Sequence, residues 1–193
     1  MANIITLSRI FLAFIAMGLL FLGDKFAPVS VVLTVFVMWF DGLDGYIARK
    51  FNETSKLGAV LDIMGDRIVE NLYWICFAAL GWISVIVPII VLTRGIITDS
   101  LRSLALEKGF TPFGEKTMMQ GKIAKFIVAS NFSRFTYAVC KAVAFVFLIA
   151  GHIGSQADHT IYTIGLICTY IAVAFCVLRG LPVIFESKRF LKD

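Results

Sequence analysis

The chain has 193 residues, of which 59% are hydrophobic and 16% are charged. This composition is too apolar for a soluble domain of this size and is typical of a protein that crosses a membrane several times. The net charge of +5 could suggest nucleic-acid binding, but the basic residues recur in alternate connecting loops, so we predict no nucleic-acid partner.

Six apolar runs predict an all-α polytopic membrane protein with six transmembrane helices, in one domain that covers residues 1–193. The first run carries Arg9, lacks a small-residue cleavage site and is followed by further runs, so it is an anchor rather than a signal peptide. The runs cover residues 4–22, 28–48, 57–80, 82–105, 122–151 and 160–184.

The distribution of basic residues predicts the topology. The connections 23–27, 81–83 and 151–159 contain one basic residue, Lys25. The other connections and the C-terminal tail contain Arg49, Lys50, Lys56, Lys108, Lys116, Lys122, Lys125, Lys188, Arg189 and Lys192. Because cytoplasmic loops of membrane proteins are enriched in Lys and Arg, both termini are predicted to be cytoplasmic.

Polar residues lie at the start of the first apolar run, in the segment Asn3-Ile-Ile-Thr6-Leu-Ser8-Arg9. Thr6 or Ser8 could cap the first helix. Arg9 could extend its charged end toward lipid headgroups. These residue types alone therefore require no function.

Four aspartates border the second and third apolar runs: Asp41, Asp44, Asp62 and Asp66. Each pair is three or four residues apart, so each pair shares one helical face. A buried Asp costs about 2.5–3.5 kcal/mol at a helix centre, or roughly 10 kcal/mol for four, so a counter-charge is expected. Two such faces that meet across a short loop would suit Mg²⁺, Mn²⁺ or Ca²⁺ rather than zinc. The alternative is that these are interfacial residues that cap helix ends.

The aspartates belong to the pattern Asp-x2-Asp-Gly-x2-Ala-Arg-x8-Gly-x3-Asp-x3-Asp, which residues 41–66 match at every fixed position. This segment resembles the signature of the CDP-alcohol phosphotransferase family, whose members are integral membrane enzymes of phospholipid synthesis. The resemblance implies a polar active-site cavity on the cytoplasmic side of the membrane, bacterial inner or cell membrane localisation, and a homodimer.

The resemblance also implies roles for the signature residues. Two divalent ions, Mg²⁺ or Mn²⁺, would be held by Asp41, Asp44, Asp62 and Asp66, and Asp66 would also be the catalytic base. Arg49 could simply obey the topology rule, but a planar guanidinium also suits a nucleotide phosphate. The residues implied to bind the CDP-lipid are Asn3, Gly45, Arg49, Ser55 and Gly58, with Asn3 included because the N-terminal segment is similar to that of phosphatidylglycerophosphate synthases.

The fourth apolar run carries Arg94, Thr98 and Arg102 at intervals of four residues, which makes one polar stripe on an apolar helix. Two arginines within a span indicate a buried anion or a water-filled cavity. Alternatively, Arg102 lies near the cytoplasmic end and Arg94 pairs with a carboxylate such as Asp66 or Glu70. We expect Arg94 and Arg102 to bind a phosphorylated acceptor, and Asp99 to pair locally.

Two further basic residues are candidates for the acceptor site. Lys116 lies in a Lys-Thr-x-x-Gln segment that resembles one found after the fourth span in phosphatidylglycerophosphate and cardiolipin synthases. Arg134 lies in the fifth run, on the same helical face as Lys141. The sequence departs from that subfamily at Gly95 and before Lys116, which leaves the acceptor alcohol open.

The resemblance implies transfer of a phosphatidyl group from CDP-diacylglycerol to the hydroxyl of sn-glycerol 3-phosphate, with release of CMP. Within the same chemistry, the acceptor could instead be inositol phosphate or phosphatidylglycerol. A divalent-cation transporter with an aspartate-lined site is an alternative from a different class, although the chain lacks the internal repeat that transporters favour.

Overall fold

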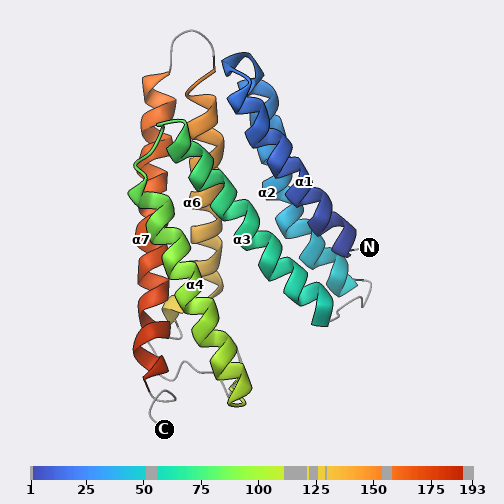
Figure 1. Ribbon diagram of the computed structural model, residues 1–193, viewed down its shortest axis with the longest axis vertical. Coiled ribbons are helices and arrows are strands. Elements are labelled where there is room, and N and C mark those ends of the chain that lie inside the picture. The colour runs from blue at the N-terminus through green and yellow to red at the C-terminus, as the bar shows by residue number, and fades with distance from the viewer. Residues whose placement is uncertain are drawn as a thin grey trace. The chain divides into compact units, whose positions relative to one another are not determined.

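The computed structural model describes residues 2–50, 56–110, 121, 126–128, 130–153 and 158–188, and every element in these ranges is helical (Figure 1). The long helices are α1 (Ala2–Phe21), α2 (Ala27–Lys50), α3 (Lys56–Ala79), α4 (Ile86–Glu107), α6 (Asn131–Ala150) and α7 (His159–Ser187). A short 3-10 helix, η1 (Asp24–Phe26), connects α1 and α2.

The long helices coincide with the six predicted apolar runs, and the all-α prediction is confirmed. The largest shifts are at two helix starts: α4 begins at Ile86 rather than residue 82, and α6 begins at Asn131 rather than residue 122. The first shift arises because residues 80–85 form turns, which an apolar run cannot reveal.

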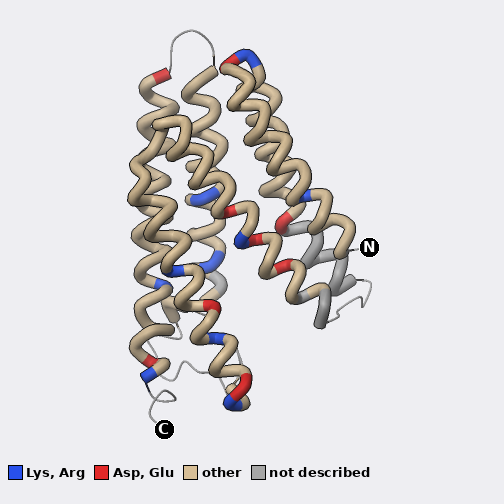
Figure 2. Tube along the Cα trace, viewed as in Figure 1, with Lys and Arg blue, Asp and Glu red and all other residues tan. Residues whose placement is uncertain are grey.

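Three helical stretches of the described chain are long and apolar enough to cross a membrane: Asn3–Phe21, a stretch that contains α6 and ends at Ala150, and His159–Ser187. Helix α3 carries acidic and basic positions along its length (Figure 2), among them Asp62, Asp66, Arg67 and Glu70. Such charges make α3 less apolar than these three stretches. Six membrane spans therefore remain a prediction.

The chain forms two compact units. The first comprises Met1–Val85 and Ala142–Cys168, and the second comprises Ile86–Lys141 and Thr169–Asp193. Helices α6 and α7 each contribute residues to both units. Whether these units form one functional domain, as the sequence predicts, stays a prediction.

The first unit is built around α1, which packs against α2 and α3. Its core is aromatic: Tyr73 of α3 stacks on Phe145 of α6 with ring centroids 4.6 Å apart, and Trp74 and Phe77 contact the same Phe145 ring edge-on. Hydroxyl groups in this core are paired, since Tyr73 donates a hydrogen bond to Thr34 at 3.0 Å. The buried surface of α3 thus combines large rings with a paired Tyr73 hydroxyl, whereas the buried Nε1 of Trp74 has no hydrogen-bond partner in the described chain.

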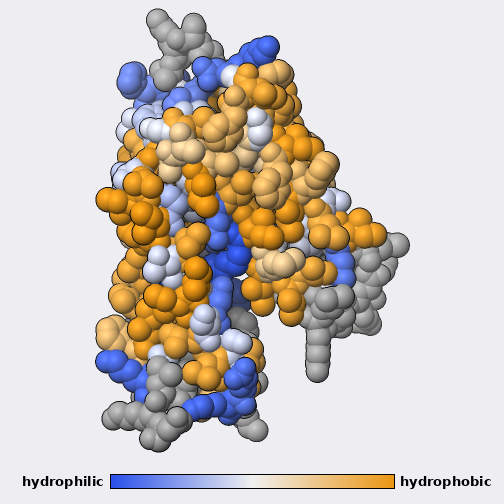
Figure 3. Space-filling view, viewed as in Figure 1, coloured by the Kyte–Doolittle hydropathy of each residue, from blue (hydrophilic) through white to orange (hydrophobic). Residues whose placement is uncertain are grey.

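Large apolar side chains cover much of the face seen in Figure 3. On α1 and α2, Phe11, Phe14 and Trp39 are each more than half exposed. Exposed rings of this size are unusual on a soluble protein but are expected where a helix faces lipid. This exterior agrees with a membrane protein.

Glycines end two of the helices in the same way. Gly81 has a φ of 75°, and the hydrogen bonds Trp82 N to Phe77 O and Gly81 N to Ala78 O complete a Schellman motif after α3. Gly109 has a φ of 84° and ends α4 with the equivalent pair of bonds. A residue with a Cβ atom would be strained at either position.

The second unit has an apolar core formed by Val128, Ala105 of α4 and Val183 of α7. Leu101 and Phe110 pack against this core. Phe110 follows Gly109, so the turn that ends α4 also places this ring on the core. This packing joins the C-terminal part of α4 to the C-terminal part of α7. Arg102 of α4 and Arg179 of α7 lie one turn before the residues of this core.

Candidate active site

The four signature aspartates lie on two neighbouring elements of the first unit: Asp41 and Asp44 on α2, and Asp62 and Asp66 on α3. The side chains of Asp41 and Asp66 are each about half exposed, at 46% and 49%. Asp62 is also exposed and takes part in a contact of its own. The side chain of Asp44 lies outside the part of the chain that the structure describes.

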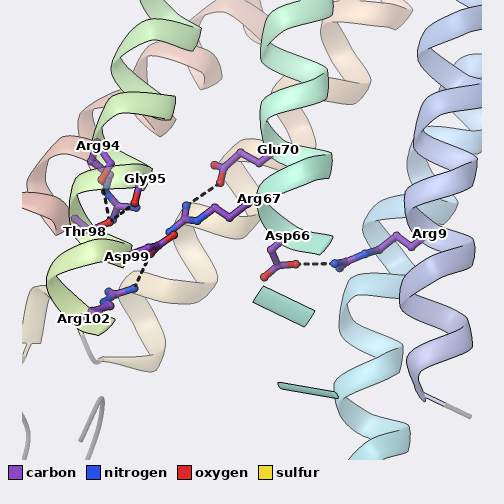
Figure 4. A network of polar contacts seen from close by, with 9 residues as sticks. All are labelled: Arg9, Asp66, Arg67, Glu70, Arg94, Gly95, Thr98, Asp99 and Arg102. Carbon is purple, nitrogen blue, oxygen red and sulfur yellow. Dashed lines mark hydrogen bonds and ion pairs between the residues drawn. The ribbon is translucent and has the colours of Figure 1, made fainter. Parts of the chain in front are cut away.

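Arg9 of α1 joins the two half-exposed carboxylates. Its Nη1 donates a hydrogen bond to Oδ1 of Asp41, and its Nη2 donates one to Oδ1 of Asp66 at 2.8 Å. Figure 4 shows the second of these bonds, which reaches across from α1 to α3. The Arg9 side chain is 1% exposed. One buried cation therefore connects α1, α2 and α3 and brings Asp41 and Asp66 close together.

Gly65 makes room for this arrangement. A Cβ atom at Gly65 would lie 2.8 Å from Cγ2 of Thr6 and 3.1 Å from Nη2 of Arg9, both on α1. Helix α1 can therefore approach α3 closely at the residue that precedes Asp66. Sequence reasoning did not select Gly65, and it treated Arg9 as a residue that reaches toward lipid headgroups; the structure instead buries Arg9 against two signature aspartates.

A second ion pair lies one turn further along α3. Arg67 Nη1 lies 3.5 Å from Oε2 of Glu70, and Glu70 is only 4% exposed. Glu70 and Asp66 were the carboxylates considered as partners for Arg94; each is paired within the first unit, with Arg67 and Arg9 respectively.

The carboxylates were predicted to hold divalent ions. Among the residues whose side chains are described, no group of three His, Cys, Asp or Glu residues is arranged to hold a metal. However, the donors are carboxylate oxygens, the ligand type that Mg²⁺ and Mn²⁺ prefer, and Arg9 shows that Asp41 and Asp66 converge on one positive charge. The donor chemistry of these two residues therefore suits a hard divalent cation, and the metal site itself stays a prediction.

The residues expected to bind the CDP-lipid are described only in part. Asn3 lies partly buried in the first turn of α1, and Gly58 lies in the first turn of α3. Gly45 and Arg49 lie on α2, but the described chain does not include the Arg49 side chain. Ser55 falls in a gap between the described ranges. Their grouping stays a prediction.

In the second unit, the polar stripe on α4 is largely satisfied by local contacts. Thr98 is fully buried and its hydroxyl donates to the carbonyl oxygens of Arg94 and Gly95, at 2.9 and 3.1 Å (Figure 4). Arg102 lies 3.8 Å from Oδ1 of Asp99, which confirms that Asp99 pairs locally. The hydroxyl of Thr98 is therefore satisfied by the backbone of its own helix and is not offered to a ligand.

Arg94 lies against α7. A Cβ atom at Gly180 would lie 2.9 Å from Cγ and 3.1 Å from Nε of Arg94, so the absence of a side chain at Gly180 gives Arg94 its space. The next residue back, Arg179, donates a hydrogen bond to the carbonyl of Val128 at 3.4 Å, and its guanidinium lies 5.4 Å from the ring centre of Tyr137.

Arginines of three helices belong to this unit: Arg94 and Arg102 lie on α4, Arg134 on α6 and Arg179 on α7. The Nε atoms of Arg94 and Arg179 are buried and have no hydrogen-bond partner among the described residues. Sequence reasoning did not select Arg179 as a site residue; the signal was Gly180 beside it, which permits close packing. Lys116, the remaining predicted acceptor residue, lies between the described ranges.

Comparison with known proteins decides the family. A family model described as CDP-alcohol phosphatidyltransferase matches residues 1–178, which include α1 to α6 and most of α7. The chain belongs to the CDP-alcohol phosphatidyltransferase family. The match agrees with the signature of residues 41–66 and includes Arg9 and Gly65, which lie against each other in this structure.

Individual relatives carry two kinds of name. A CDP-diacylglycerol–glycerol-3-phosphate 3-phosphatidyltransferase of Aquifex aeolicus is 35% identical over 66 residues, which are 34% of this chain and 36% of the relative. One of the same name from Pseudomonas fluorescens is 29% identical and covers 77% of this chain and 81% of the relative. A CDP-diacylglycerol–inositol 3-phosphatidyltransferase of Arabidopsis thaliana is 39% identical over 34% of this chain and 28% of the relative.

The matched segment thus spans about a third of the length of the Aquifex and Arabidopsis relatives. Family membership covers nearly the whole chain, whereas the two names differ in the acceptor alcohol. The family assignment therefore supports the reaction type more directly than it supports the acceptor.

Proposed function

We propose that this protein transfers the phosphatidyl group of CDP-diacylglycerol to the hydroxyl of sn-glycerol 3-phosphate and releases CMP, as a step of membrane phospholipid synthesis. One observation carries the proposal: Arg9 holds Asp41 and Asp66 together from two different helices, within the signature of a family named for this reaction. Convergent carboxylates are what a metal-assisted displacement at phosphorus requires.

The proposed cofactor is two divalent ions, Mg²⁺ or Mn²⁺, with Asp41, Asp44, Asp62 and Asp66 as their ligands. When bound, such ions would neutralise the pyrophosphate oxygens and stabilise the leaving phosphate. The half-exposed positions of Asp41 and Asp66 support this assignment, because each carboxylate keeps a side that is open to a soluble ligand.

Asp66 is proposed as the general base. The acceptor hydroxyl would attack the lipid-side phosphorus, its proton would pass to Asp66, and the bond from that phosphorus to the bridging pyrophosphate oxygen would break with release of CMP. Asn3, Gly45, Arg49, Ser55 and Gly58 are proposed to line the site of the CDP-lipid.

The acceptor phosphate is proposed to bind the arginines of the second unit. Arg94, Arg102 and Arg134 are the residues predicted for this role, and Arg179 is added because it precedes Gly180, against which Arg94 packs. Several like charges within an apolar bundle are costly unless an anion or water compensates them. Lys116 is proposed as a further contact to the same acceptor.

The test is a transfer assay with the purified protein, CDP-diacylglycerol and a panel of acceptors, with CMP release as the readout. We expect CMP release with sn-glycerol 3-phosphate and little with free glycerol, because only the former carries the anion that the arginines would bind. Absence of CMP release with every acceptor would refute the transferase proposal.

A second acceptor deserves a place in the panel because the Arabidopsis relative is named for inositol. The panel therefore includes myo-inositol, inositol phosphate and phosphatidylglycerol. Faster CMP release with any of these than with sn-glycerol 3-phosphate would replace the proposed acceptor and leave the transferase chemistry in place.

We also propose that the protein acts as a homodimer in the cell membrane, with its active site in a cavity that faces the cytoplasm. This location would let the CDP headgroup of the lipid substrate reach the site while its acyl chains remain in the bilayer. Light scattering of the detergent-solubilised protein tests the dimer, and a mass that fits one chain would contradict it.

A further inference from the structure

The guanidinium of Arg9 contacts two of the proposed metal ligands from the interior of the protein. Only 1% of the Arg9 side chain is exposed, whereas both of its carboxylate partners are about half exposed. Arg9 therefore reaches Asp41 and Asp66 from the protein interior, and the opposite sides of both carboxylates remain accessible from outside.

Each carboxylate has acceptor capacity left after its bond to Arg9. An ionised carboxylate offers two oxygens with about four lone-pair sites, and the bonds to Arg9 use Oδ1 of Asp41 and Oδ1 of Asp66. The same side chains can therefore bind a cation on their exposed side while Arg9 stays in place behind them.

The geometry of the contact depends on a guanidinium. Two different nitrogens of one planar group each donate to one carboxylate, so the fork sets the distance between Asp41 and Asp66. The Nε atom of Arg9 is buried and has no hydrogen-bond partner in the described chain, so the two carboxylates are what orient the group.

The neighbouring helix is shaped to admit this group. Gly65 precedes Asp66, and a Cβ atom there would lie 3.1 Å from Nη2 of Arg9 and 2.8 Å from Cγ2 of Thr6. Gly18, on the same helix as Arg9, has nothing within 4 Å of a Cβ atom and carries no comparable constraint.

We propose that Arg9 is a positioning residue: it holds Asp41 and Asp66 at a fixed separation from the buried side, so that their exposed oxygens are arranged in advance for a divalent cation. The inference rests on the proposed function, because it takes these carboxylates as metal ligands. Groups that orient metal ligands in this way typically contribute about 10–100-fold to metal affinity.

The test measures Mn²⁺ binding to the metal-stripped protein in detergent, from the electron paramagnetic resonance signal of free Mn²⁺, with no lipid or acceptor present. Arg9→Lys keeps the charge but removes the planar fork, so we expect Mn²⁺ affinity to fall by about 10–100-fold. Gly65→Ala keeps Arg9 but places a methyl group against its guanidinium, so we expect Mn²⁺ affinity to fall in this variant as well.

Two control variants match these changes. Arg67→Lys makes the same chemical change one residue from Asp66, at a side chain that pairs with Glu70 instead. Gly18→Ala makes the same change as Gly65→Ala on an open part of α1. Both should bind Mn²⁺ like the parent protein.

Three outcomes would overturn the proposal. Parental Mn²⁺ affinity in both Arg9→Lys and Gly65→Ala would show that Arg9 serves only packing. Tighter Mn²⁺ binding in Arg9→Lys or Arg9→Gln would show that Arg9 competes with the ion. A parent protein that binds no Mn²⁺ would show that the aspartates are not metal ligands. If Arg9→Lys does not fold, Gly65→Ala decides. Mn²⁺ binding without CMP release would refute the proposed function but leave this inference standing.

Discussion

Two carboxylates of the signature, Asp41 and Asp66, are alike in exposure and in their partner in this structure. Asp41 and Asp66 are both about half exposed and both accept a hydrogen bond from Arg9. The family resemblance assigns the base to Asp66 alone. Residue-level tests therefore have to separate proton transfer from ligand binding.

We expect Asp66→Asn to lower the rate of CMP release by at least about 100-fold. An amide cannot take up the proton of the attacking hydroxyl, and general-base catalysis contributes at least this factor. The variant should remain folded and still bind CDP-diacylglycerol weakly. CMP release in the transfer assay and CDP-diacylglycerol binding to the same preparation are the measurements. Near-parental turnover would remove Asp66 from the mechanism.

Removal of divalent ions should abolish CMP release, since clustered carboxylates otherwise repel one another and the pyrophosphate. The protein is stripped with a chelator and assayed before and after Mg²⁺ or Mn²⁺ is restored. Recovery with either ion is the expected result. Full activity of the stripped protein would contradict metal dependence.

Arg94 and Arg102 are eight residues apart, about 12 Å along a helix at 1.5 Å per residue, so one phosphate is not expected to contact both. We predict that Arg94→Lys and Arg102→Lys raise KM for the phosphorylated acceptor before they change KM for CDP-diacylglycerol, because Lys lacks the bidentate fork. Steady-state kinetics with each substrate varied in turn gives both values. Equal losses with charged and uncharged acceptors would show that these arginines are structural.

At the scale of the helices, glycine has two distinct uses. Gly65 and Gly180 allow close packing, since a Cβ atom at either would lie within 3 Å of a side chain on the opposing helix. Gly81 and Gly109 instead adopt positive φ and end α3 and α4. Both uses help to place the charged residues: packing glycines border Arg9 and Arg94, and terminal glycines set where the polar helices stop.

Gly81→Ala should lower the free energy of unfolding by about 1–2 kcal/mol, because the left-handed conformation costs an L-residue with a Cβ atom about this much. Gly18→Ala, within α1 and with open space around the new methyl group, should leave stability unchanged or slightly raised. Unfolding of the purified variants in detergent by denaturant compares the two. Equal stability of Gly81→Ala and the parent would show that the turn has another conformation.

At the scale of the whole molecule, the sequence predicted the helices better than it predicted the contacts between them. Apolar runs are continuous in the sequence and their signal sums over many residues, so the six long helices of the described chain could be recognised. The bond from Arg9 to Asp66 joins residues 57 positions apart, and no local pattern encodes it. The aspartate spacing indicated a shared cation site, but not that an arginine would occupy its buried side.

The charge distribution along the chain predicts that both termini are cytoplasmic. A reporter that is active only in the cytoplasm should be active when fused after residue 193, and inactive when inserted in the connection 151–159. The inserted copy is the matched control for expression and folding. The reverse pattern of activity would invert the topology and place the aspartates on the far side of the membrane.

Because Arg9 precedes both of its partners in the chain, Asp41 and Asp66 become available to it at different times during synthesis. Asp41 emerges with α2, so an α1–α2 hairpin can enter the bilayer with its arginine already neutralised, whereas an unpaired arginine within an apolar span is costly. Asp66 arrives only with α3. Nascent chains that carry Asp41→Asn and stop before α3 should therefore be extracted from membranes by alkali more readily than parental chains of the same length, and equal extraction would show that α1 inserts without its partner.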